Sequence, residues 1–192
     1  MRNASASTNC WAVVNGAGTY TGTCTLAGGT YSIGSVNAAA GAVITAFLDG
    51  ETPDAATVTR SAAANITGFN MYQNRLIVRH EDAGPTTNAN LGQYDYDNDT
   101  DIPFTSNSNN LTVNDGAKLY IWGGDTLTPG GTITTSPSSS NSSPDGDIQI
   151  VSAAVLSMGA NALSIGGDWV SYGTFSYTGT PTATFTATGV QH

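Results

Sequence analysis

Short apolar-rich stretches alternate with clusters of Gly, Asn, Ser and Thr along the whole chain. In its first third, alternating apolar and polar positions are separated by turn signals. The stretches that carry this pattern are 11–14, 20–26, 30–36, 42–48 and 56–59. Strands at this spacing favour a small antiparallel β-sandwich, of Ig-like or prealbumin-like type. The stretch 66–80 predicts two further strands, separated by a turn near Gln73 and Asn74, that close this sandwich.

The pattern changes after Asn110, where apolar stretches become very short and are split by Gly and Asn. They lie at 111–113, 118–122, 126–127, 132–134, 148–150, 155–156, 163–165, 168–170, 174–177 and 182–186. This part predicts a short-strand β-solenoid or a second β-sheet region, interrupted by a Ser-rich loop over 134–144. The predicted domains are a sandwich module at 1–82, an acidic loop region at 83–109 and the solenoid-like or second β region at 110–192.

Composition supports an all-β fold class. Only 10% of the residues are charged, against about 25% in an ordinary globular protein. Glu, Lys, Arg and Leu, which suit exposed helix faces, are scarce, whereas Thr, Val, aromatics and Gly-rich turns suit pleated strands.

Charge and hydropathy exclude two classes of partner. The net charge of −9, with Lys118 as the single lysine, leaves no basic patch for nucleic acid or an anionic membrane surface. The longest apolar runs, 41–48 and 148–156, fall short of the roughly 20 residues that span a bilayer, so no membrane insertion is expected. No apolar signal-peptide core follows Met1, so an exported form would be mature or trimmed.

The two cysteines, Cys10 and Cys24, flank a Gly-rich segment centred on 15–18 that predicts a hairpin turn. Such a turn brings them onto adjacent strands, where a disulfide is expected, with two buried thiols as the alternative. A disulfide implies an oxidising compartment, and therefore an extracellular or cell-surface location.

Two resemblances to bacterial surface proteins accompany these patterns. The stretch Gly29–Ile33, followed by Gly41–Gly50, resembles carboxypeptidase-regulatory-like or Cna-B-like sandwich modules, which implies a spacer or stalk. The segment Asn161–Trp169, with the later Gly173–Phe175 and Ala183–Gly189, resembles a repeat of large adhesins, which implies a β-solenoid. An exposed end turn of a solenoid must be capped or paired with another chain.

The most distinctive polar cluster places four aspartates, Asp95, Asp97, Asp99 and Asp101, at every second position. Packed carboxylates repel one another unless a cation neutralises them, and alternating oxygen ligands suit Ca²⁺. Thr100 and Ser106 stand where an EF-hand needs Gly and Glu, so the predicted calcium site is not an EF-hand. The alternative is a solvated acidic loop.

No catalytic motif emerges. His80, Glu81 and Asp82 place an imidazole beside carboxylates, but the sequence contains no G-x-S-x-G elbow. The prediction is that the protein is not an enzyme. Tyr94, Tyr96, Trp122 and Trp169 are candidate platforms for stacking on sugar rings, with packing inside the protein as the alternative.

The leading functional hypothesis is an extracellular structural protein, either a segment of a surface protein or a subunit of a fibre or sheath. It self-associates by β-strand pairing of one terminal segment, 3–13 or 180–191. The alternative is an adhesin module that binds carbohydrate or a cell surface with Ca²⁺. A third hypothesis, an ice or mineral binder, needs Thr ladders of the kind that Thr182 and Thr184 begin.

Overall fold

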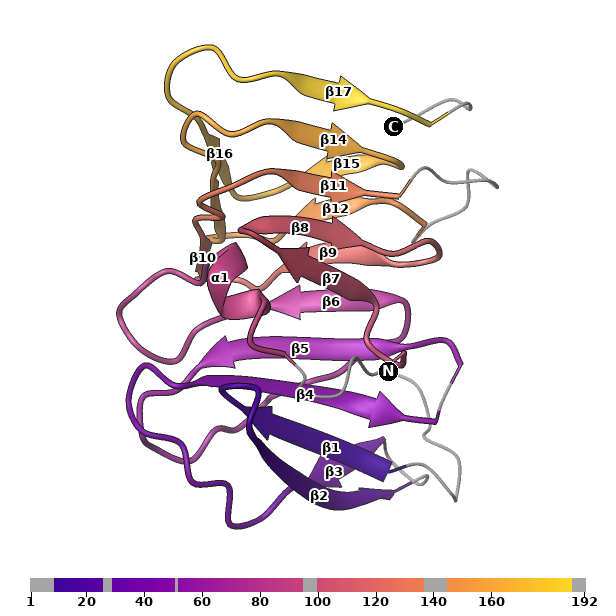
Figure 1. Cartoon of the computed structure of the whole chain (residues 1–192), viewed down its shortest axis with the longest axis vertical. Helices are drawn as coiled ribbons and strands as arrows, with labels where there is room; N and C mark the ends of the chain where they lie inside the picture. Colours follow the sequence, from indigo (N-terminus) through magenta and orange to yellow (C-terminus); the bar gives the residue numbers. More distant parts are fainter. Residues whose placement is uncertain (1–8, 26–28, 51, 95–99, 137–144, 188–192) are drawn as a thin grey trace.

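The computed structural model describes residues 9–25, 29–50, 52–94, 100–136 and 145–187. These residues form strands in three sheets, with the helix α1 (Asn88–Leu91) as their one α-helix (Figure 1). The predicted all-β class is confirmed. Across the described part of the chain, no helix has the length and apolar character needed to cross a membrane.

The largest sheet, called sheet A here, has nine strands and runs the length of the molecule (Figure 1). Its order is β15-β12-β9-β6-β5-β4-β1-β2-β3. The bounds are β1 (Asn9–Val14), β2 (Gly18–Thr25), β3 (Thr30–Ser32), β4 (Val43–Asp49), β5 (Ala55–Arg60), β6 (Arg75–Val78), β9 (Lys118–Ile121), β12 (Ile148–Ile150) and β15 (Trp169–Ser171). Pairing is antiparallel from β3 to β5 and parallel from β5 to β15.

The predicted antiparallel sandwich is not seen, because all described strands between 9 and 60 lie in this one sheet. Apolar residues on its outer face, such as Val14 and Ile44, still need cover. Irregular segments supply it: Ile33, Ile66 and Phe69 pack on that face in place of a second sheet. A local alternation of apolar and polar residues predicts a covered face but not what covers it.

Two smaller sheets complete the C-terminal part. Sheet B has the order β10-β13-β16, and sheet C has the order β17-β14-β11-β8-β7. Their bounds are β7 (Phe104–Asn107), β8 (Asn110–Val113), β10 (Thr126–Leu127), β11 (Ile133–Thr135), β13 (Val155–Ser157), β14 (Leu163–Ile165), β16 (Thr174–Ser176) and β17 (Ala183–Phe185).

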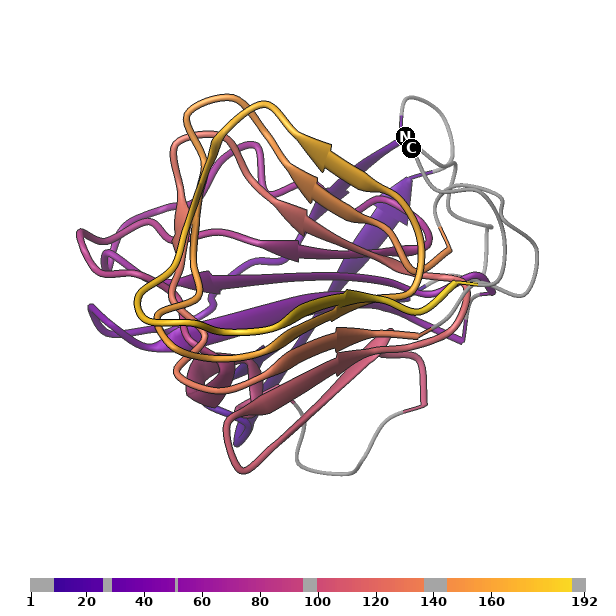
Figure 2. The ribbon, with the colours of Figure 1, turned by 90° about the horizontal axis from the view of Figure 1, so that it is seen from above.

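From β8 onward the chain visits sheets C, A and B in turn and then repeats the circuit. The successive circuits are β8-β9-β10, β11-β12-β13 and β14-β15-β16, and β17 begins another. Seen from above, they enclose a common centre (Figure 2). Neighbouring strands of successive circuits are parallel, whereas β7 pairs antiparallel with β8.

Columns of apolar side chains fill this centre. Because parallel neighbours are in register, an inward residue lies over the inward residue of the previous circuit. Sheet B thus stacks Leu127, Leu156 and Phe175. One hydrophobic cluster extends from Val13 to Ile165. β6 pairs with both β5 and β9, so sheet A continues across residues 82 and 109, and the predicted domain division stays a prediction.

Polar groups and glycines fix the corners between sheets. The buried Asn88 amide, held in the capped helix α1, donates to the carbonyls of Asn109 at 2.8 Å and Thr132 at 2.9 Å. At another corner, a Cβ on Gly173 would lie only 2.3 Å from the carbonyl oxygen of Ala154. The backbones of successive circuits therefore approach too closely there for any side chain.

The two cysteines lie on adjacent strands, as the hairpin predicted. Cys10 is buried in β1 opposite Gly22, and Cys24 follows two residues later in β2, which places both on one face of the sheet. The Cys24 side chain lies outside the described part, and the disulfide stays a prediction.

Candidate functional site

The acidic cluster falls largely outside the described residues. This applies to Asp95, Asp97 and Asp99, and to the predicted stacking residue Tyr96. Asp101 accepts a hydrogen bond from the Gly50 amide at 2.5 Å. The described residues contain no group of three His, Cys, Asp or Glu side chains placed to hold a metal. The calcium site stays a prediction.

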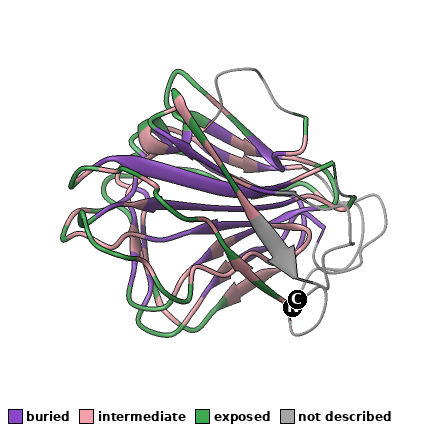
Figure 3. Cartoon of the chain, turned by 90° about the horizontal axis from the view of Figure 1, so that it is seen from below, coloured by how far each residue is buried: buried purple, intermediate pink, exposed green. Residues whose placement is uncertain are grey.

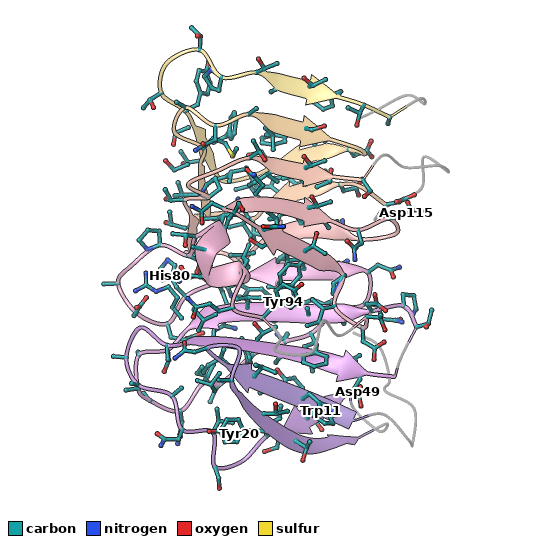
Figure 4. The ribbon with its side chains drawn as sticks, in the orientation of Figure 1. Trp11, Tyr20, Asp49, His80, Tyr94 and Asp115 are labelled. Atoms are coloured by element: carbon teal, nitrogen blue, oxygen red, sulfur yellow. The ribbon has the colours of Figure 1, made fainter. Side chains whose placement is uncertain are left out.

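Two of the predicted stacking aromatics pack within the protein. Tyr94 meets Phe104 edge to face, with ring centroids 5.0 Å apart (Figure 4). Trp169 meets Phe175 in the same way at 4.9 Å. Trp122 instead follows β9 on the outer face of sheet A, with the Tyr120 ring at 6.0 Å. Of these three, only Trp122 lies on an outward-facing layer.

His80, labelled in Figure 4, is held by backbone groups at both ring nitrogens. Nε2 accepts from the Thr126 amide at 3.0 Å, so the proton of the neutral ring belongs on Nδ1, 2.8 Å from the Asp82 carbonyl oxygen. Asp125, with its carboxylate 3.7 Å from Nδ1, completes the cluster. Burial raises the pKa of Asp125, and His80 and Arg79 oppose this rise. These contacts fix a corner next to β10.

The C-terminal end of the stack differs from the circuits that precede it. In sheet C, one inward column runs Val113, Thr135, Ile165 and Phe185. The first three residues are at most 1% exposed, whereas Phe185 is 53% exposed. About half of the Phe185 side chain faces solvent, so this column, which is apolar apart from Thr135, ends open to solvent.

Strand edges are open at the same end. At this end, β15, β16 and β17 form one edge of sheets A, B and C, respectively, and each pairs on one side only within the described part of the chain. The opposite edges are β3, β10 and β7. Alternate backbone groups of a terminal strand point away from its neighbour. The segment 169–187 contains no charged residue, and Pro181 precedes β17 instead of lying in it. Two of the usual devices that block edge pairing, charged side chains and Pro within the strand, are therefore missing, although each of the three strands is only three residues long.

Aromatic side chains concentrate on this last circuit. The large hydrophobic residues classed as exposed among the described residues are Tyr172, Tyr177 and Phe185, and all three lie there. A pocket of about 320 Å³ opens beside one of them, Tyr177, and is also lined by Phe175 and Pro181. Strand edges, exposed rings and a pocket thus coincide on one uncharged surface, which we call the C-terminal end surface, defined by 169–187.

The two predicted terminal segments for strand pairing differ in their surroundings. Residues 9–13, the described part of the first, lie in β1 between β2 and β4 and have no open edge. The described part of the second contains β17, which has one. The sequence pattern predicts strand pairing for either segment and does not choose between them. The absence of charge after Asp168 is the further sequence signal that would have drawn attention to it.

Comparison with known proteins identifies no relative. No protein-family model, curated protein or solved structure matches the chain. The resemblances to Cna-B-like modules and adhesin repeats therefore stay predictions.

Proposed function

We propose that the protein is an extracellular structural protein whose chains self-associate by β-strand pairing at the C-terminal end surface. The observation that carries the proposal is the open column ending in Phe185, 53% exposed, beside three strand edges without a neighbour in the described part. A pairing strand from a second copy would satisfy the open backbone groups and cover the ring at once. In a longer surface protein, a following circuit of the same chain would take that place.

Charge favours a second copy as the occupant. Apart from Arg2, every charged residue of the chain lies between Asp49 and Asp168. Two chains of net charge −9 repel each other least where their surfaces are uncharged. The proposed extracellular location rests on the predicted disulfide between Cys10 and Cys24.

Two arrangements use this surface. Joining two C-terminal ends covers aromatic with aromatic residues and gives closed pairs, whereas joining the C-terminal end of one copy to the N-terminal end of the next gives a fibre or sheath. The N-terminal end offers exposed Thr19 and Thr21 at the matching positions. Closed pairs are therefore favoured, and electron microscopy distinguishes them from filaments.

Sedimentation velocity over a range of protein concentrations tests the proposal. We expect the wild-type mass to rise with concentration and Phe185→Asp to remain a monomer, because the substitution places a charge where the two copies meet. The matched control is Thr105→Asp, which adds the same charge at an exposed position on the far edge strand of sheet C. This variant should associate like the wild type.

Two results would overturn self-association through this surface. One is a wild-type protein that stays monomeric up to its solubility limit. The other is association of Phe185→Asp as strong as that of the wild type. If Thr105→Asp dissociates as readily as Phe185→Asp, net charge and not the surface controls association.

A further inference from the structure

All four cations in the described part, Arg60, Arg75, Arg79 and Lys118, come from β5, β6, β9 or the residue after β6. Three of them have an acidic partner. Arg60 pairs with Asp82 at 2.8 Å, Arg79 with Glu81 at 2.7 Å and Lys118 with Asp147 at 3.6 Å. Arg75 has no carboxylate within ion-pair distance in the described part of the chain. In a protein of net charge −9, this exception stands out.

The Arg75 guanidinium lies instead between two tyrosine rings. It is 5.2 Å from the centroid of Tyr72 and 5.6 Å from that of Tyr120. Such contacts stabilise a cation and hold its planar fork in place without neutralising it. In the neighbouring strand, Lys118 is directly opposite Arg75, so a second cation reinforces the positive potential there. Burial lowers the pKa of Lys118, Asp147 opposes this, and Arg75 adds to the lowering.

The surface around Arg75 combines aromatic side chains with the amide side chain of Gln149. Outward positions of adjacent strands place Tyr120 next to Gln149, and strands lie about 4.8 Å apart. Trp122 follows on the same outward face two residues after Tyr120, partly exposed. Partly exposed rings stack on the apolar faces of sugar rings, and amides bind their hydroxyls.

We infer that the Arg75 surface, formed by Arg75, Tyr72, Tyr120, Trp122 and Gln149, binds a carboxylate-bearing sugar unit of an acidic polysaccharide. The guanidinium binds the carboxylate and the outward aromatic rings pack on the sugar. A singly charged carboxylate suits the site better than a phosphate, because Asp147 and Asp168 occupy the same outward row beyond Lys118 and repel a higher negative charge. This site shares no residue with the C-terminal end surface, although Gln149 pairs with Val170 of that surface, and the inference does not rest on self-association.

Calorimetric titration with an oligomer of galacturonic acid tests the inference. We expect binding that weakens as salt is added. The methyl-esterified oligomer has the same rings without the charge and should bind at least tenfold more weakly. Arg75→Gln should weaken binding of the acid oligomer about 10- to 100-fold, the range of one lost charge-assisted contact. Arg75→Lys should retain part of the affinity, because it keeps the positive charge but loses the planar guanidinium that donates two hydrogen bonds to one carboxylate.

The matched control is Arg60→Gln, which removes the same charge from an ion-paired arginine in β5. The affinity for the acid oligomer should stay within about twofold of the wild type, because salt screens the effect of the changed net charge. Tyr120→Ala supplies a second variant should Arg75→Gln lower the melting temperature. The inference is overturned if the acid oligomer does not bind, if its methyl ester binds equally well, or if Arg75→Gln and Arg60→Gln weaken binding alike. Equally tight binding of an oligoglutamate peptide would assign the surface to a protein partner and overturn the sugar assignment.

Discussion

The two ends of the stack differ in the side chains that cover the hydrophobic core, which are polar at one end and apolar at the other. At the N-terminal end, the inward side chains Val13 and Trp11 of β1 are followed on β2 by Thr19 and Thr21, which are exposed and polar. Figure 3 shows the molecule from this end, coloured by burial. At the C-terminal end, Ile165 is followed on β17 by Phe185, which is exposed and apolar. The Thr hydroxyls form hydrogen bonds with water, whereas exposing an apolar phenyl ring to water is unfavourable. Both ends have an edge strand in sheet A, β3 at one end and β15 at the other. The comparison indicates that the two ends differ in their side chains, which are polar at the N-terminal end and aromatic at the C-terminal end.

The largest expected contrast is between buried and open members of the inward columns. Leu156 is fully buried in the column of sheet B, so Leu156→Ala should lower the free energy of unfolding by about 2–5 kcal/mol. Phe185→Ala, at the open end, should cost only roughly 1 kcal/mol in the monomer because half of the ring is already in water. Urea unfolding at a concentration that keeps the chain monomeric measures both. Equal costs would mean that Phe185 is covered within its own chain.

The predicted disulfide sharpens the contrast at the N-terminal end. If Cys10 and Cys24 are joined, the bond closes a loop of about 15 residues, and reduction should lower stability by about 3 kcal/mol in the chain-entropy model. Thermal unfolding with and without reductant measures this, and intact mass after thiol alkylation establishes the bond. Self-association should persist after reduction because the C-terminal end surface lies at the other end of the stack. Two alkylated cysteines without reductant would refute the disulfide.

The close approach of successive circuits provides a third comparison. Gly173→Ala places a Cβ against the backbone of Ala154 and should lower stability by roughly 1–3 kcal/mol, and more if the backbone cannot shift. Gly34→Ala is the matched control, because a Cβ there meets nothing within 4 Å. Differential scanning calorimetry should find a lower melting temperature only for the first variant. A wild-type melting temperature for Gly173→Ala would mean that the last circuit is held loosely.

The smallest effect concerns Asp125, in the middle of the stack between the two ends. Burial raises its pKa above the ordinary value of 3.8, so the folded protein binds this proton more tightly than the unfolded chain. The stabilisation that results is fully present below pH 3.8 and is lost as pH rises through the raised pKa. Asp125→Asn should remove this loss of stability with rising pH, and urea unfolding at several pH values measures it. An unchanged pH dependence would contradict the assignment.

Local pattern predicts where many strands lie but not their partners. The predicted segments 42–48, 118–122, 148–150 and 163–165 coincide with strands, because their apolar alternation is a local property. Whether Ile148 pairs with Leu119 and Trp169, as it does, depends on register over long sequence distances. The predicted sandwich failed for this reason.

The candidate site is harder still to predict from sequence. The Thr-rich alternation around Phe185 does not say that this ring is inward, nor that no later strand covers it in the described part. Similarly, Arg75 and Arg79 both contact aromatic rings, but of the two only Arg79 has an acidic partner in the described part, Glu81 two residues on. Such differences depend on which side chains are neighbours in the folded protein, and the sequence alone does not specify these neighbours.

Hydrogen exchange of the β15, β16 and β17 amides, followed at increasing protein concentration, tests strand pairing most directly. Backbone amides that point away from the neighbouring strand, such as that of Phe185, should become protected from exchange as protein concentration rises. Amides of β10 and β13 should exchange at constant rates. Self-association without any added protection of these edge amides would contradict strand pairing as the basis of assembly.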